Sequence, residues 1–144
     1  MKIVDQILKH KGNTVHSISP NSIMQEALKI MAEKDVGALL VIENENVVGI
    51  LSERDYARKV FLKGKSSKDV PVKEIMSEKV ICVSPSQSVE DCMALMSEKR
   101  IRHLPVMSEN KLVGLISIGD VVKAVISERE FVIDQLVQYI TGTH

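Results

Sequence analysis

Val15–Val60, VHSISPNSIMQEALKIMAEKDVGALLVIENENVVGILSERDYARKV, decides the fold because the chain carries this stretch twice. At an offset of 65 residues it matches Val80–Val125, VICVSPSQSVEDCMALMSEKRIRHLPVMSENKLVGLISIGDVVKAV, without a gap. Of the 46 aligned pairs 13 are identical, and 12 others exchange one apolar residue for another. An internal repeat of this kind indicates one supersecondary unit used twice.

The composition of the chain limits its possible functions. With 144 residues it has about the size of one ordinary domain. Its 19 basic and 19 acidic side chains leave a formal charge of zero. Proteins that bind along a phosphate backbone usually carry a basic excess, so this balance argues against a nucleic-acid partner.

Two further features of the sequence predict a cytoplasmic protein. There is no run of 18 apolar residues and no charged-then-apolar leader at Met1, so neither a membrane span nor a secretory signal is expected. Cys82 and Cys92 form no CxxC motif and have no His at zinc-ligand spacing. Such thiols fit a reducing compartment and predict no metal site.

Each repeat begins with an extended stretch that ends in Ser-Pro and continues into an amphipathic helix. Proline forces the residue before it out of the helical conformation, so the strand is expected to end at Ser19 and at Ser84. Ser22 and Ser88 are predicted N-terminal caps of the helices that follow. The apolar faces of the two helices are predicted to comprise Met24, Ala27, Leu28 and Met31, and Val89, Cys92, Met93 and Met96.

Two short apolar runs follow each helix and predict a β-hairpin. In the first repeat they are Ala38–Ile42 and Val47–Leu51, joined by four polar residues. In the second they are Leu104–Met107 and Leu112–Ile116, again with a four-residue connection. A second helix is expected to begin near Glu53 or Ile118, so each repeat is predicted to be β-α-β-β-α.

The remaining segments flank the repeats. We expect residues 1–64 to hold the first repeat with an N-terminal segment, 65–79 a linker, 80–127 the second repeat and 128–144 a C-terminal helix. Within the linker, Val72–Met76 has a loose counterpart at Val4–Leu8. The C-terminal helix carries an apolar stripe that either covers the core or meets another chain: Ile133, Leu136, Val137 and Ile140.

The polar residues of interest lie at the same spacing in Gly49–Asp55 (GILSERD) and Gly114–Asp120 (GLISIGD). In each, a Ser ends a strand and an acid follows in the first helical turn. One interpretation is a capping box, in which the Ser and the acid bond each other's backbone N–H. The other is a ligand site, because a fixed carboxylate accepts from ribose hydroxyls and a helix N-terminus attracts phosphate. Capping alone requires neither the Gly nor the repetition.

The chain resembles tandem cystathionine-β-synthase (CBS) domains, a pair often called a Bateman module. The resemblance covers roughly Val4 to Ile126 and rests on the ungapped repeat, the Ser-Pro openings, the segment Arg102–Val106 (RHLPV) and the two Gly-x-x-Ser-x-x-Asp segments. It implies an α+β fold in which two β-α-β-β-α repeats pack about a pseudo-two-fold axis. In this chain the extra C-terminal helix is added to them.

The resemblance also implies a ligand. In this family, clefts between the repeats bind adenosine-containing molecules such as AMP, ADP, ATP, NAD or S-adenosylmethionine. By similarity, Asp55 and Asp120 hold the ribose hydroxyls, and Ser52 and Ser117 lie beside ribose or phosphate. The family packs module against module through helices, so a homodimer is expected.

Basic residues distinguish the two repeats. By similarity, Arg102 and His103 face phosphate, but the first repeat has Gly37 and Ala38 at the same positions. Conversely, the first repeat has Arg54, Arg58 and Lys59 in its second helix, where the second repeat has Gly119, Lys123 and Ala124. Arg54 is the best candidate for a phosphate contact, with a solvated surface position as the alternative. We therefore predict two unequal clefts.

No set of residues predicts catalysis. The sequence has no nucleophile with a positioned base, no glycine-rich phosphate loop and no metal set. The leading hypothesis is a non-catalytic module that binds an adenosine ligand and signals to a partner protein by changing shape or assembly. The alternative is a structural protein in which the repeats serve dimerisation and the Ser and Asp residues are only caps.

Overall fold

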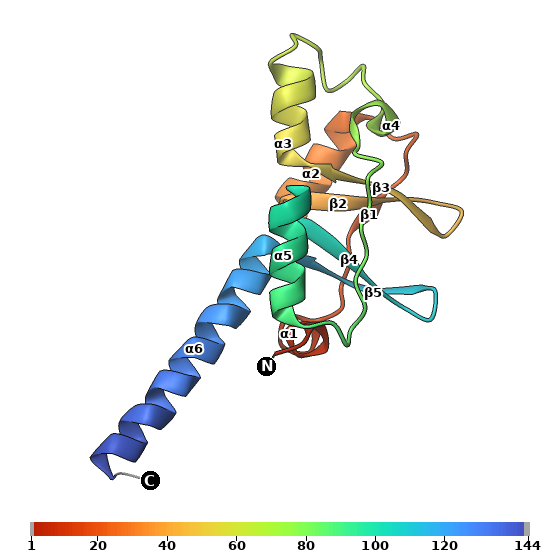
Figure 1. The fold of residues 1–144 in the computed structure, drawn as a ribbon. Helices are drawn as coiled ribbons and strands as arrows, with labels where there is room; N and C mark the ends of the chain where they lie inside the picture. The colour runs from red at the N-terminus through yellow and green to blue at the C-terminus, as the bar shows by residue number, and fades with distance from the viewer. Residues whose placement is uncertain (1, 143–144) are drawn as a thin grey trace. The chain divides into compact units, whose positions relative to one another are not determined.

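The structure, a computed structural model, describes residues 2–142 and consists of two compact units of helices and strands (Figure 1). The repeat-1 unit is Val15–Val80, and the repeat-2 unit combines Met1–Thr14 with Ile81–His144. Each unit has its own cluster of buried apolar side chains. The fold is α+β, as the sequence predicts.

The repeat-1 unit is built on a three-stranded sheet with the order β1-β2-β3. Strand β1 (Ser17–Ile18) runs parallel to β2 (Ala38–Glu43), which pairs antiparallel with β3 (Asn46–Ser52). The helical segments are α2 (Met24–Lys34), α3 (Glu53–Tyr56), the π-helical turn η1 (Ala57–Phe61) and α4 (Val72–Ile75). The predicted face of α2 is confirmed, since Met24, Ala27 and Met31 are buried.

The repeat-2 unit is built on a hairpin of β4 (His103–Ser108) and β5 (Lys111–Ser117). An isolated parallel bridge from Val83 to Val106 replaces the pairing of β1 with β2. Its helices are α1 (Val4–Lys11), α5 (Val89–Lys99) and α6 (Ile118–Thr141). Val89, Cys92 and Met96 are buried as predicted, whereas Met93 is exposed.

Both hairpins turn more tightly than the sequence predicts. Glu43 pairs with Asn46 and Ser108 with Lys111, so each ladder extends by one residue pair toward the turn. Each connection therefore has two residues instead of four. The connecting residues, Asn44-Glu45 and Glu109-Asn110, all have positive φ between 50° and 68°. That backbone matches the right-handed twist of paired strands, and one Asn in each turn tolerates it well.

One of the two predicted helix caps is correct. The Ser88 hydroxyl accepts a hydrogen bond from the backbone N–H of Asp91 at 3.0 Å. The prediction for Ser22 is wrong, because Ile23 is the N-cap of α2 and no side chain caps it. A backbone carbonyl of the linker bonds the start of the helix instead: the carbonyl of Val70 accepts a hydrogen bond from the N–H of Met24 at 2.8 Å. Backbone carbonyls thus satisfy N–H groups that a Ser side chain usually serves.

The two short helices α1 and α4 do not pack on the repeat that directly follows them in the sequence. Each belongs to the unit of the other repeat. Helix α1 precedes the first repeat but belongs to the repeat-2 unit, and α4 precedes the second repeat but belongs to the repeat-1 unit. Their backbone bonds correspond: Asp5 N–H donates to Pro85 at 2.9 Å, and Lys73 N–H donates to Pro20 at 3.0 Å. The structure therefore groups the N-terminal segment with the second repeat, not with the first as in the predicted boundaries.

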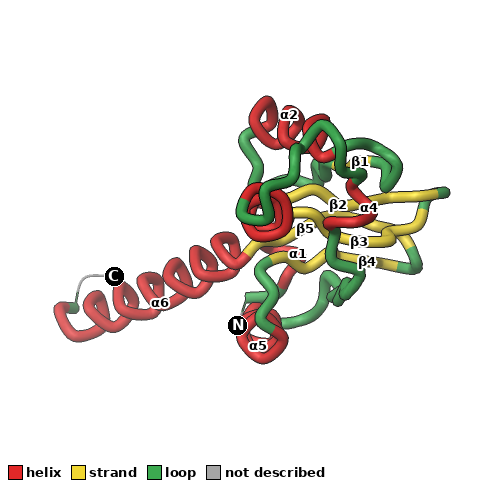
Figure 2. The backbone as a smooth tube through the Cα atoms, turned by 90° about the horizontal axis from the view of Figure 1, so that it is seen from above, coloured by secondary structure: helices red, strands yellow, loops and turns green. Residues whose placement is uncertain are grey.

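Helix α6 is a single helix of 24 residues that runs out from the repeat-2 unit (Figure 2). The sequence predicts two segments here, with a boundary between residues 127 and 128. No Gly or Pro interrupts the chain between Asp120 and Thr141, so the helix continues. In the first repeat the corresponding helix ends before Gly64, which has a φ of 69°.

Gly49 and Gly114 allow a side chain near each short helix to lie against a strand. A Cβ on Gly114 would lie 2.6 Å from Cδ2 of Leu8, and a Cβ on Gly49 would lie 2.6 Å from Sδ of Met76. Leu8 and Met76 hold corresponding positions in the similar segments Val4–Leu8 and Val72–Met76. The repeated Gly, which capping does not explain, thus has a packing reason.

We predict that Gly114→Ala lowers the free energy of unfolding by about 1–3 kcal/mol, because added atoms in a packed contact force strain. Gly119→Ala is the matched control: its Cβ would lie 3.6 Å from the nearest atom, Oγ of Ser117, and Ala favours a helix over Gly. Urea denaturation measures both variants. Equal stability of the two would contradict the close contact with Leu8.

Candidate functional site

The two Ser-x-x-Asp segments form capping boxes of the same geometry. At the start of α3, the Ser52 N–H donates to Oδ2 of Asp55 at 2.9 Å, and the Asp55 N–H donates to Oγ of Ser52 at 3.2 Å. At the start of α6, the Ser117 N–H donates to Oδ2 of Asp120 at 2.8 Å, and the Asp120 N–H donates to Oγ of Ser117 at 3.2 Å. The capping interpretation is therefore correct for both. It fixes each carboxylate where a strand meets a helix.

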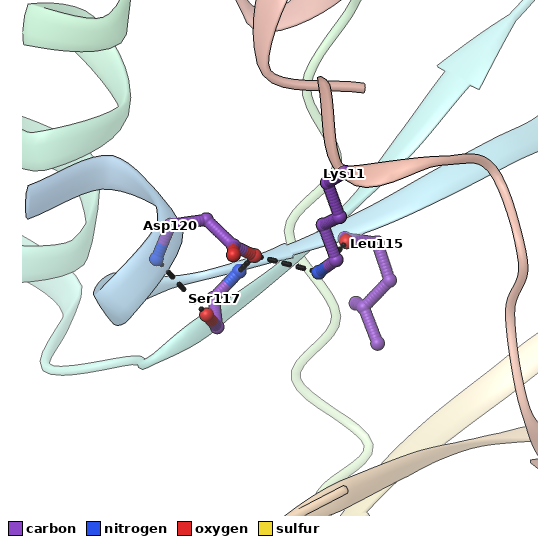
Figure 3. A network of polar contacts seen from close by, with 4 residues as sticks. All are labelled: Lys11, Leu115, Ser117 and Asp120. Carbon is purple, nitrogen blue, oxygen red and sulfur yellow. Dashed lines mark hydrogen bonds and ion pairs between the residues drawn. The ribbon is translucent and has the colours of Figure 1, made fainter. Parts of the chain in front are cut away.

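Each carboxylate also holds a lysine ammonium. Nζ of Lys59 lies 3.2 Å from Oδ1 of Asp55 and donates to the carbonyl of Ile75 at 2.9 Å. Nζ of Lys11 lies 2.6 Å from Oδ2 of Asp120 and donates to the carbonyl of Leu115 at 2.7 Å (Figure 3). Both carboxylates are thus part of a network of a backbone N–H, an ammonium and a carbonyl.

The lysine of each network comes from a different element. Lys59 lies in the π-helical turn η1, four residues after Asp55. The corresponding residue of the second repeat is Ala124, and Lys11 at the end of α1 supplies the ammonium there. π-helical turns occur frequently at functional sites. The two sites are therefore chemically alike but built differently.

Asp120 is held as a carboxylate. Burial alone would raise the pKa of Asp120, but hydrogen bonds from Lys11 and Ser117 and the charge of Lys11 outweigh it and lower the pKa below its ordinary value. Its side chain is 23% exposed. A partly exposed, charged acceptor of this kind is suited to hydroxyl donors.

His103 and Arg102 lie near this carboxylate in the fold. His103 is half-buried and is the register partner of Ser117. Burial and the charge of Lys11 lower the pKa of His103, while Asp120 opposes them, which favours a neutral imidazole. Arg102 is exposed, and its carbonyl accepts from the N–H of Ile118 at 2.8 Å. The structure thus brings His103, Ser117 and Asp120 into one electrostatic environment.

Arg54 and Arg58, the predicted basic residues of the first repeat, are both exposed. Arg54 lies in the first turn of α3, beside Asp55 in sequence, and Arg58 lies in η1. Both belong to the helical segment that holds Asp55 and Lys59. Their contact with phosphate stays a prediction.

A cavity of about 520 Å³ lies beside Asp120, between α1 and α6. Four of its lining residues are basic: Lys2, His10, Lys11 and Lys123. The sequence alone does not reveal these residues as a group. The similarity of Val4–Leu8 to Val72–Met76 marks α1 as a repeated element, but it does not say on which repeat the helix docks.

The described residues form neither a metal site nor a membrane-spanning helix. In residues 2–142 there is no group of three or more His, Cys, Asp or Glu side chains that could hold a metal ion. Within the same range, no helix is long and apolar enough to cross a membrane.

Known proteins share this architecture. The family model described as "CBS domain" matches residues 11–61 and 72–127. The mitochondrial CBS domain-containing protein CBSX3 of Arabidopsis thaliana is 38% identical over 148 residues, which cover 96% of this chain and 72% of that protein.

Solved structures agree with this match. A protein with CBS domains from Burkholderia ambifaria, described as a candidate signal-transduction protein, is 53% identical and superposes with a TM-score of 0.84, covering 88% of this chain and 95% of that one. A hexameric CBS-CP12 protein from bloom-forming cyanobacteria is 30% identical, with a TM-score of 0.76, over 84% of this chain and 66% of that one.

We predict that Lys11→Met lowers the free energy of unfolding by about 1 kcal/mol at pH 7, because a charge-assisted hydrogen bond to a partly buried carboxylate is lost. Lys9→Met is the matched control, since Lys9 pairs with Asp5 at 3.0 Å on an exposed part of the same helix. Its loss is expected to cost less than about 0.5 kcal/mol. Denaturant unfolding compares the two variants.

The ion pair between Lys11 and Asp120 should make the stability depend on pH. A carboxylate whose pKa is lower in the folded state stabilises the fold at pH values above its unfolded-state pKa, near 3.8. This contribution is lost as the pH falls through the folded-state pKa. The stability difference between wild type and Lys11→Met should thus vanish in acid. By NMR, the pKa of His103 should rise in Lys11→Met, because the charge of Lys11 no longer adds to the effect of burial. A pH-independent difference with an unchanged His103 pKa would contradict the ion pair.

Proposed function

The chain belongs to the CBS-domain family and carries the domain twice, and on this premise we propose that it is a non-catalytic regulatory module that binds an adenosine-containing ligand. The candidate ligands are AMP, ADP, ATP, NAD and S-adenosylmethionine. Ligand occupancy would alter the shape or assembly of the module and so signal to a partner protein. Proteins built as CBS-domain pairs are typically regulatory and ligand-binding.

One observation carries this proposal: the partly exposed side chain of Asp120 lines a cavity that basic residues also line. A carboxylate accepts hydrogen bonds from the two hydroxyls of a ribose, and lysine ammonium groups bind phosphate as point charges. The cavity volume of about 520 Å³ lies within the usual range for small-molecule sites. The chemistry therefore favours a ribose that carries phosphate.

The roles of the individual residues follow from this chemistry. We assign the ribose to Asp120 and Ser117 in one site and to Asp55 and Ser52 in the other. Arg102 and His103 remain candidates for phosphate near Asp120. In the first repeat, Arg54 and Arg58 are the corresponding candidates.

The alternative function is a structural dimerisation protein, and one observation favours it. The capping boxes and lysine pairs give the carboxylates of Asp55 and Asp120 partners within the protein, without a ligand. A thermal-shift screen of the five ligands separates the two functions, because a ligand at 100 times its Kd stabilises by about 2.7 kcal/mol. A melting temperature that none of them shifts would favour the structural function.

Assembly and location complete the proposal. We propose a homodimer in the cytoplasm, with no nucleic-acid or membrane partner. The location is supported by two free cysteines, Cys82 and Cys92, which fit a reducing compartment. The neutral formal charge supports the exclusion of nucleic acid.

We predict that Asp120→Asn weakens binding of an adenosine ligand at its site by about 10- to 150-fold, the cost of losing hydrogen bonds to a charged group. Asp91→Asn is the matched control, because Asp91 also stands three residues after a capping Ser, at the start of α5. It should leave the affinity unchanged. Isothermal titration measures both, and an equal effect of the two variants would mean that Asp120 is a cap and nothing more.

We also predict that Arg54 distinguishes AMP from adenosine. On an Asp120→Ala background, which leaves the Asp55 site, Arg54→Ala should weaken AMP by about 5- to 150-fold and leave adenosine unchanged, because a guanidinium takes a phosphate bidentately. Competition binding of the two ligands is the measurement. Equal loss of both, or no loss, would place Arg54 among the solvated surface residues.

A further inference from the structure

The outer part of α6 exposes an unusual number of large apolar side chains. In the described part of the chain, only Val121 and Ala124 of this helix are buried. Beyond them, eight large apolar side chains are each at least 50% exposed: Ile126, Phe131, Val132, Ile133, Leu136, Val137, Tyr139 and Ile140. Apolar surface of this extent on one helix is typical of an interface.

These side chains follow a heptad spacing. Ile126, Ile133 and Ile140 are seven residues apart, and Leu136 lies three residues after Ile133. Val122, 43% exposed, continues the row toward the N-terminus, and Arg129 occupies the one polar position in it. We call this row, Val122 to Ile140, the α6 seam. Apolar residues in a 3–4 spacing form the contact row of a helix pair, so the seam fits another helix.

The seam is not the face that α6 buries against its own unit. Val121 and Ala124 contribute to the core of the repeat-2 unit, together with residues of α1, α5 and the β4–β5 hairpin. At 100° per residue, the centre of the seam lies roughly a third of a turn or more away from them. The same helix therefore has one buried face and one exposed apolar face.

We propose that the α6 seam binds the α6 seam of a second copy of this chain, with the two helices antiparallel. In this pairing Val122 lies opposite Ile140 of the second copy, Ile126 opposite Leu136, and Arg129 opposite Ile133. By symmetry each pair occurs twice, which gives six layers over about 27 Å of helix. The centre of the interface lies near Phe131.

Charge decides the orientation of the pair. A parallel pair places Arg129 directly opposite Arg129 of the second copy, so two like charges meet in the seam. The antiparallel pair brings Arg129 of each copy next to Glu130 of the other around the two-fold axis. Both residues are exposed in the single chain. One polar residue in an otherwise apolar row commonly fixes the register and orientation of paired helices.

The same charges favour a second copy over an unrelated helix. Because Arg129 and Glu130 are adjacent and near the centre of the seam, the seam is complementary to itself on a two-fold axis. The interface rests on the homodimer of the proposed function and deepens it. A monomeric protein would overturn both the seam and the homodimer, whereas ligand binding succeeds or fails in the separate thermal-shift screen.

The first test is the mass in solution by light scattering at about 50 µM. The wild type should have twice the chain mass of 16.0 kDa. Ile133→Lys should weaken the dimer about 100-fold or more, because it buries an ammonium without a partner. Gln138→Lys adds the same charge away from the seam and should leave the dimer intact. A monomeric wild type, or a dimer that survives Ile133→Lys, would overturn the proposal.

The second test is the orientation. Ile126→Cys and Leu136→Cys are prepared separately on a Cys82→Ser background; Cys92 stays because it is buried, and burial with the charge of Asp91 raises its pKa to about 11. After mild oxidation, an equimolar mixture should give the mixed disulfide. Disulfides of each variant with itself, without the mixed product, would show a parallel pair and overturn the antiparallel assignment.

The third test is charge exchange. Arg129→Glu should weaken the dimer about 10-fold or more by placing Glu next to Glu130 of the second copy. Arg129→Glu combined with Glu130→Arg should restore the wild-type affinity to within about threefold. Failure of the double variant to recover would contradict the Arg129–Glu130 contact. Circular dichroism should show the same helix content in all variants.

Discussion

The carboxylate at the third position of a helix is the constraint on which both candidate sites depend. Asp55 and Asp120 each close a strand-to-helix junction by accepting the N–H of a Ser, and each also holds a lysine ammonium. The first contact satisfies a helix end and favours a negative charge beside the helix dipole. The second keeps that charge paired while leaving part of it accessible. The fold and the proposed function therefore use the same carboxylate groups.

This double use explains why capping and ligand binding are not exclusive alternatives. A cap residue is rigid, and a rigid acceptor loses little entropy when a ligand arrives. The lysine that pairs with Asp120 also lines a basic cavity, so an arriving ligand meets the carboxylate and the ammonium together. Because Lys11 is the last residue of α1, a ligand that displaces it would also act on the end of that helix. Such a link between occupancy and helix docking is the kind of differential contact that a sensor requires.

Most of the fold could be predicted from local sequence patterns. The features that could not be predicted depend on contacts between segments that are distant in the sequence. The strand, helix and hairpin order of each repeat follows from periodicity and Ser-Pro signals. The Asp and Ser positions follow from their repetition. The sequence does not predict that α1 joins the second repeat, because the apolar pattern of a short helix does not say on which repeat it packs. For the same reason Lys11 was missed, whereas Lys59 lies on the helix of its own Asp. The Ser22 cap was wrong because linker carbonyls, distant in sequence, bond the first N–H groups of α2.

The proposed function depends on binding of an adenosine ligand at the two strand-to-helix junctions. An NMR titration of the ¹⁵N-labelled protein with AMP, ATP, NAD and S-adenosylmethionine observes these junctions directly, through the backbone amides of Ser52, Asp55, Ser117 and Asp120. We predict that at least one of the four ligands shifts these amide signals in a saturable way. Ligand binding at the junctions would be contradicted if millimolar concentrations of all four left these signals unchanged, or moved only signals elsewhere in the chain.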